Sequence, residues 1–160
     1  HPNDRRQRQM CIRDSFMIRN LRHTGIVVDN LDKCLNFYLS IGFCEVSRGI
    51  ETGSYIDNLV GLNNVKLECV KLALNQNITL ELLKYHSHPY ENNDVPRMSN
   101  RVGCSHIALT VSNVLDCFNL VSQNGGGSIN QIQTSPDGKV KVVYCYDPEG
   151  NIIEIVEELN

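Results

Sequence analysis

The chain has 160 residues and a formal net charge of −3, with 15 Lys and Arg residues against 18 Asp and Glu residues. This length suits one compact domain or two small half-domains that share a core. The two signs of charge are interspersed, so no basic surface points to nucleic acid. No apolar run approaches the roughly 18 residues that a membrane-spanning helix needs. We therefore expect a globular protein with neither a nucleic-acid nor a membrane partner.

Residues 1–16 form an arginine-rich segment without hydrophobic periodicity. A secretory signal needs an apolar stretch after its basic start, and this segment has none. A mitochondrial presequence is a weaker interpretation, since Asp4 and Asp14 interrupt the basic charge. We interpret residues 1–16 as a disordered or non-native leader, with the fold starting at Met17.

The seven cysteines are scattered along the chain and never form a Cys-x-x-Cys motif. Several of them fall at apolar-periodic positions, which favours reduced, buried thiols that behave as small hydrophobic residues. A zinc site or a disulfide framework is the minor alternative. We therefore expect a cytoplasmic protein.

The first half of the chain predicts one main helix among several strands. Residues 21–28 are typical of a strand, and a helix is expected to begin at Asn30 or Asp32 and to end at Gly42. The further expected elements are a strand at 43–50, a helical or looped insert at 55–62, and strands at 65–73 and 78–83 that are joined by a turn at 75–77.

The second half repeats this order. A strand at 105–111 precedes a helix that begins at Asn113 and ends at the glycines of 125–127. The elements expected after it are a short strand near 129–133, a turn at 136–138, a strand at 140–146, a tight turn at 147–150 and a last strand at 152–156.

A direct sequence repeat supports this parallel between the halves, since residues 23–42 align without a gap against residues 106–125. The positions identical at the offset of 83 are His23/His106, Val28/Val111, Asn30/Asn113, Cys34/Cys117, Asn36/Asn119 and Gly42/Gly125. We predict two tandem βαβββ modules, residues 17–84 and 104–160, joined by a connection over 85–103. A duplicated unit that starts with a histidine on a strand suggests one site built from two halves.

Each half also ends with a glutamate inside an apolar strand, Glu81 in Thr-Leu-Glu-Leu-Leu and Glu154 in Ile-Ile-Glu-Ile-Val. Burying such a carboxylate is costly unless it is paired or bound to a metal. A single histidine or glutamate of this kind is more often structural or exposed, but both types recur in both halves. His23, Glu81, His106 and Glu154 therefore form a candidate set of nitrogen and oxygen donors for one divalent ion of the Zn, Ni, Co, Mn or Fe type.

These motifs resemble the vicinal oxygen chelate superfamily, which includes glyoxalases, epimerases, extradiol dioxygenases and bleomycin-resistance proteins. The resemblance covers residues 21–157 and rests on His-x-Gly-Ile-x-Val-x-Asn-Leu, x-Glu-Leu-Leu, His-Ile-Ala-x-x-Val and Asp-Pro-Glu-Gly-x-x-Ile-Glu. It implies an α+β fold in which the two modules form an incompletely closed, cup-shaped β-barrel with helices outside. It also implies a metal at the floor of the cup, held by His23, Glu81, His106 and Glu154. A homodimer is implied because many relatives complete their sites across subunits.

The four filled ligand positions favour a glyoxalase-like or epimerase-like lyase or isomerase. Such enzymes abstract a proton next to the carbonyl of a small or thiol-conjugated substrate, such as a hemithioacetal or thioester, through a metal-stabilised enediolate or enolate. Glu154 matches the ligand that also serves as the base. Glu68 is a candidate second base if its strand face lines the cup, and an ordinary exposed residue beside Lys66 if it does not.

Two other functions stay open. Extradiol dioxygenases hold iron with two histidines and one glutamate, and Glu81 would be an additional ligand in such a site. Bleomycin-resistance-type proteins bind small molecules without catalysis and usually lack the metal ligands. Epimerase-like members often have glutamine at the position of Glu81, which favours the glyoxalase branch.

Overall fold

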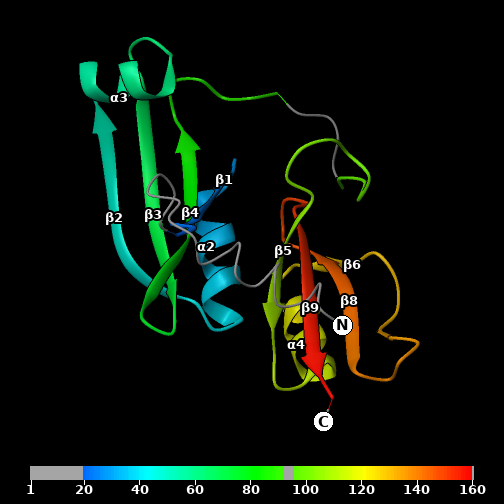
Figure 1. Ribbon diagram of the computed structural model, residues 1–160. Coiled ribbons are helices and arrows are strands. Elements are labelled where there is room, and N and C mark those ends of the chain that lie inside the picture. Colours follow the sequence, from blue (N-terminus) through cyan, green and yellow to red (C-terminus); the bar gives the residue numbers. More distant parts are fainter. Residues whose placement is uncertain (1–19, 92–95, 160) are drawn as a thin grey trace, which may run out of the picture.

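The computed structural model describes residues 20–91 and 96–159, so the leader expected at 1–16 lies outside the described residues (Figure 1). Every helix in the described ranges is too short or too polar to span a bilayer. The α+β prediction with two βαβββ modules is confirmed. The two modules have separate mixed sheets, and in the described chain these do not close into one barrel.

The first module has a four-stranded sheet in the order β1-β4-β3-β2. Strand β1 runs parallel to β4, and the other neighbours are antiparallel. The expected helical or looped insert is a short helix, α3. The elements are β1 (Thr24–Val27), α2 (Leu31–Ser40), β2 (Cys44–Thr52), α3 (Ser54–Val60), β3 (Lys66–Leu74) and β4 (Asn77–Tyr85).

The second module repeats the pattern with the order β5-β9-β8-β6, while β7 pairs with β8 beside this path. Strand β5 is parallel to β9, as β1 is to β4. The elements are β5 (His106–Thr110), α4 (Val114–Gln123), β6 (Gly127–Ser128), β7 (Gln133–Thr134), β8 (Val140–Tyr146) and β9 (Ile152–Glu158).

The single strand expected near 129–133 is wrong, because two very short strands flank that segment instead. Gly127 pairs with Tyr146, and Gln133 pairs with Val142. The first residues of these pairs are six positions apart in the chain, whereas their partners on β8 are only four positions apart. The surplus residues cannot all join the ladder, and the chain leaves it between β6 and β7.

The two main helices begin in the same way. The Asn30 side chain accepts a hydrogen bond from the Lys33 backbone N–H at 3.0 Å, and the Asn113 side chain accepts one from the Asp116 N–H at 2.9 Å. An asparagine at this position satisfies a backbone donor that the helix itself leaves free. The repeated asparagine of the sequence is therefore a helix cap in both modules.

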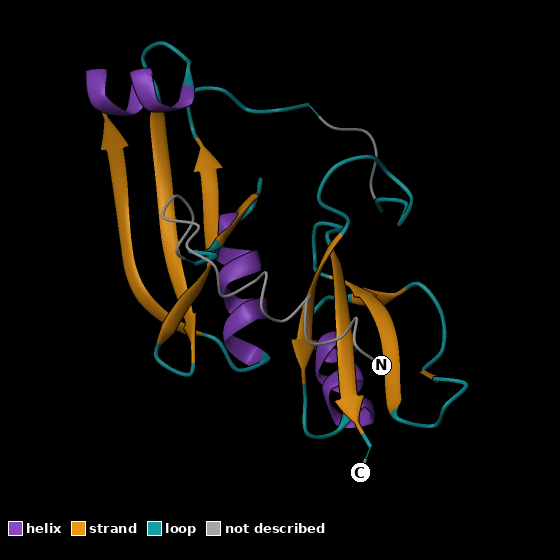
Figure 2. Cartoon of the chain, in the orientation of Figure 1, coloured by secondary structure: helices purple, strands orange, loops and turns teal. Residues whose placement is uncertain are grey.

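One hydrophobic core links the two modules. Helix α2 lies between the first sheet and the second module (Figure 2), and the fully buried Phe37 and Tyr38 pack edge-to-face within it. The same core includes Val121 of α4 and Ile153 of β9. The two main helices, α2 and α4, each cover one face of their own sheet and leave the opposite face for the His–Glu pairs described below (Figure 1).

The described cysteines are free thiols. Cys34, Cys117 and Cys145 are buried, and burial raises the pKa of the Cys145 thiol to about 11. Cys44 and Cys104 are exposed, so the expectation of burial is wrong for these two.

Candidate metal centre

The first module places His23 beside Glu81. The parallel register of β1 and β4 pairs Gly25 with Glu81, so the histidine that precedes β1 lies close to the glutamate. His23 Nε2 is 3.1 Å from Glu81 Oε2, and the Glu81 side chain is only 14% exposed. Because the neighbouring Leu80 and Leu82 point into the core, Glu81 lies on the sheet face away from α2.

The second module repeats this arrangement with His106 and Glu154. His106 Nε2 is 2.9 Å from Glu154 Oε2. The residues on either side of the glutamate, Ile153 and Ile155, are fully buried in the core. Alternation along β9 therefore places Glu154 on the face opposite α4.

The strand next to each glutamate adds one large side chain that differs between the modules. Lys71 pairs with Glu81 in the register, and its Nζ lies 3.7 Å from Glu81 Oε1. Tyr144 pairs with Glu154, and its ring centroid is 4.9 Å from that of His106. Desolvation, together with the charge of Glu154, raises the pKa of Tyr144.

Sequence reasoning missed Lys71 and Tyr144, although a signal for both was present. Each residue lies ten positions before its glutamate, at 71 against 81 and at 144 against 154. Comparing the strand before each glutamate would therefore have found both.

The two His–Glu pairs stay apart within the chain. Among residues 20–91 and 96–159, no three His, Cys, Asp or Glu side chains gather closely enough to hold a metal ion. Each pair offers one imidazole nitrogen and one carboxylate oxygen, donor types that suit a divalent transition ion. The chemistry of the predicted set thus fits such an ion, but one chain presents it as two halves.

Glu68 lies on the other face of the first sheet. Glu68 pairs with Lys84 in the register, and Lys71 pairs with Glu81. Glu68 and Lys71 are three residues apart on β3, so alternation places the two glutamates on opposite faces of the sheet. This placement argues against the expected role of Glu68 as a second base beside the metal.

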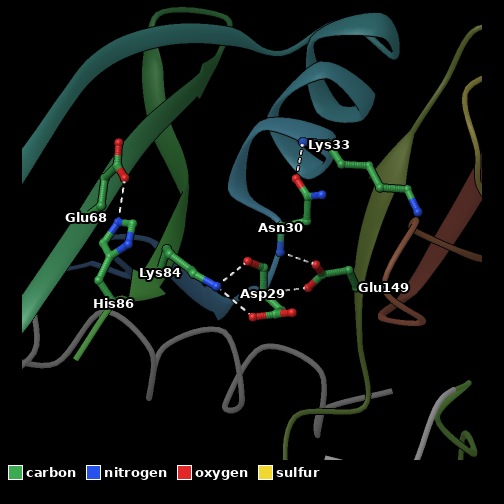
Figure 3. A network of polar contacts seen from close by, with 7 residues as sticks. All are labelled: Asp29, Asn30, Lys33, Glu68, Lys84, His86 and Glu149. Carbon is green, nitrogen blue, oxygen red and sulfur yellow. Dashed lines mark hydrogen bonds and ion pairs between the residues drawn. The ribbon is translucent and has the colours of Figure 1, made fainter. Parts of the chain in front are cut away.

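Two basic side chains hold the Glu68 carboxylate on that face. Arg48 Nε is 2.7 Å from Oε1, and His86 Nε2 is 2.8 Å from Oε2. Arg48 also contacts Asp32 of α2 at 2.9 Å. The hydrogen bonds from Arg48, followed by those from His86, lower the pKa of Glu68. Figure 3 shows the contact between Glu68 and His86.

A second polar network ties the modules together (Figure 3). The carboxylate of Glu149, in the turn before β9, accepts hydrogen bonds from the backbone N–H groups of Asp29 and Asn30 at the start of α2. Lys84 Nζ lies 2.6 Å from the Asp29 carboxylate. The start of the first module's helix is therefore held by a side chain of the second module.

Residues 20–155 match the model of the Glyoxalase/Bleomycin resistance protein/Dioxygenase superfamily. The chain belongs to this superfamily. It is 26% identical over 140 residues to a lactoylglutathione lyase of Escherichia coli O157:H7, covering 86% of this chain and 92% of the relative. It is 28% identical over 139 residues to a lactoylglutathione lyase of Salmonella typhimurium, covering 86% and 91%.

Solved structures agree on the fold. A glyoxalase family protein from Bacillus cereus superposes with a TM-score of 0.83 at 20% identity, covering 92% of this chain and all of that protein. A trypanothione-dependent glyoxalase I from Leishmania major gives a TM-score of 0.60 at 20% identity, covering 88% of each chain. At this identity the likeness supports the fold alone.

Proposed function

We propose that the protein is a metal-dependent lyase or isomerase of the glyoxalase or epimerase type. It removes a proton next to the carbonyl of a small or thiol-conjugated substrate. The observation that carries this proposal is the recurrence of a close His–Glu pair on the helix-free face of both sheets, at 3.1 Å and 2.9 Å. The relatives that are named lactoylglutathione lyase support the same class of reaction.

The proposed ligands of one divalent ion are His23, Glu81, His106 and Glu154. When bound, an ion of the Zn, Ni, Co, Mn or Fe type polarises a carbonyl and stabilises negative charge on its oxygen. The protein supplies two imidazole nitrogens and two carboxylates, and Glu81, His106 and Glu154 lie on strands. The flanking core residues fix the backbone of both glutamates, which limits the reorganisation needed on binding.

We propose that two copies of the chain complete the site, because one chain keeps the two pairs apart. In such a dimer, the first module of one copy faces the second module of its partner. The helix-free faces suit this role, since half-buried apolar side chains surround each pair. These are Leu83 in the first module and Val142, Tyr144 and Val156 in the second.

Glu154 is the proposed proton acceptor. Glu81 has two basic neighbours, His23 and Lys71, whereas the one ion pair of Glu154 among the described residues is with His106. Glu154 can therefore turn toward a substrate while breaking one contact instead of two. A carboxylate within hydrogen-bond reach of the acidic C–H group acts as a general base.

Metal content tests this proposal directly. Protein purified without chelator should contain divalent metal by elemental analysis, and His106→Ala should lose it. His86→Ala is a matched control, because His86 also pairs with a glutamate, Glu68, at 2.8 Å but on the other sheet face. The control should keep the metal.

A protein that takes up none of Ni, Co, Zn, Mn or Fe(II) would contradict the proposal. Screening the metal-loaded protein with hemithioacetals, thioesters and catechols separates the lyase or isomerase from a dioxygenase. Binding of a small molecule without metal or turnover would support the non-catalytic alternative.

A further inference from the structure

A cavity of about 690 Å³ lies where the two modules meet the connection between them. Its walls come from the ends of β1 and β4, from the first residues of the connection and from the turn before β9. Most of its lining is apolar or aromatic, and its volume is in the range of small-molecule sites. The apolar and aromatic lining residues are Val27, Val28, Leu62, Tyr85, Pro89, Tyr90 and Pro148.

Arg97 brings a guanidinium group to the wall of this cavity. Its Nε is buried and has no hydrogen-bond partner among the described residues, whereas its Nη1 donates to the Asn151 side chain. The Arg97 backbone is also held, since its carbonyl accepts a hydrogen bond from the Tyr146 hydroxyl at 3.3 Å. The guanidinium has no carboxylate partner among the described residues, and an anionic ligand in the cavity would supply one.

The other charged groups of the cavity wall already have partners. The Glu149 carboxylate is occupied by backbone N–H groups at the start of α2, and Lys84 is paired with Asp29. Among the charged side chains of the described wall, Arg97 is therefore the one without a charged or backbone partner for its charge. The complementary ligand has an apolar body and an anionic end.

We propose that this cavity binds a small organic anion, whose carboxylate or sulfonate pairs with the guanidinium of Arg97. The site is distinct from the His–Glu pairs. Val27 and Tyr85 lie four residues beyond His23 and Glu81 on the same strand faces, a distance of about 13 Å along extended strands. The inference goes beyond the proposed function and does not depend on it.

Fluorescence titration of the full chain with 8-anilino-1-naphthalenesulfonate tests the proposal. We expect saturable binding that octanoate competes away and that octanol, its neutral analogue, does not. Arg97→Met should weaken binding at least tenfold. Arg101→Met, which removes an exposed arginine of the same connection, should leave it unchanged.

A second variant guards against misfolding, because Arg97 also contacts Asn151. Leu62→Trp adds bulk to a wall residue other than Arg97 and should weaken binding, whereas Leu59→Trp, on an exposed residue of α3, should not. Thermal melts of all variants show whether each is folded.

Equal competition by octanol, or wild-type affinity in a folded Arg97→Met or Leu62→Trp variant, would overturn the proposal. Treatment with EDTA should leave the affinity unchanged, and loss of binding with the metal would place the probe at the His–Glu pairs instead. A protein that binds the probe but takes up no divalent metal would contradict the proposed function and leave the anion-binding cavity supported.

Discussion

The two modules hold the starts of their main helices in different ways. In the second module, Glu157 of β9 accepts a hydrogen bond from the Val114 N–H at 2.8 Å, within the same module. In the first module the corresponding residue of β4 is Lys84. The correspondence follows from two equivalent backbone bonds, Val28 N–H to the Leu83 carbonyl and Val111 N–H to the Val156 carbonyl.

The first module therefore lacks its own carboxylate at this place and takes one from Glu149 of the second. Tyr38 shows the same direction of dependence, because its hydroxyl donates to the buried Asp147 at 2.9 Å, while Val121 occupies the equivalent place in α4. The repeat has diverged so that the turn before β9 stabilises α2. We infer that the first module depends on the second for stability more than the reverse.

The largest expected effect separates the two metal-site glutamates. Glu154→Gln keeps the shape and one oxygen donor but cannot accept a proton, so turnover should fall about 100- to 10,000-fold. Glu81→Gln should chiefly weaken metal binding. Both are measured as kcat with a substrate found by screening and as metal per chain. Glu158→Gln, on the exposed end of β9, is the control and should retain activity. Full activity in Glu154→Gln would remove it as the base.

Tyr38→Phe tests the buried contact between the modules. It removes the hydroxyl donor to the Asp147 carboxylate and should lower the free energy of unfolding by about 2 kcal/mol. Urea denaturation measures the change. Tyr55→Phe, on a side chain that is 74% exposed, should change it little. Equal stability of the two variants would show that the Tyr38 contact contributes nothing.

Glu149→Ala and Glu157→Ala compare the two helix starts directly. Each variant leaves backbone N–H groups without their carboxylate acceptor and should cost about 1 kcal/mol. Hydrogen exchange should rise at the start of α2 in Glu149→Ala and at the start of α4 in Glu157→Ala. Faster exchange in α4 alone for both variants would contradict the dependence of the first module on the second.

The smallest effect concerns the pH dependence of Glu68. Arg48 and His86 lower its pKa from the ordinary value of 4.5, so the folded state holds fewer protons there than the unfolded state. This contribution to stability is present above about pH 4.5 and is lost as the pH falls through the lowered pKa. Glu68→Gln should lose less stability than wild type between pH 7 and pH 3. An equal loss of stability in wild type and Glu68→Gln over this pH range would contradict a stabilising contact of Glu68 with Arg48 and His86.

The sequence was sufficient to predict the modules and the His–Glu residues, because each signal is local or repeated. It left the face of Glu68 undecided, since residues on both faces of β3 are apolar: Leu67 and Cys69 on one, Val70 and Leu72 on the other. Alternation separates two faces, but only packing against α2 distinguishes them.

The placement of the two pairs was also beyond the sequence. It depends on the relative orientation of the modules, which long-range contacts such as Tyr38 to Asp147 determine. The prediction of a strand at 129–133 was wrong for a similar reason, because the pairing of this segment with β8 depends on a register that the local sequence does not specify.

Mixing two inactive variants tests the central claim that both pairs serve one metal centre across two chains. His23→Ala and His106→Ala should each lack metal alone. In a mixed dimer, the intact His23 of one chain meets the intact His106 of the other, which restores one site of two. Random mixing of the unfolded and refolded variants should then recover about a quarter of the wild-type metal per chain. Metal that stays absent after mixing, with wild-type protein refolding to full occupancy, would contradict the shared site.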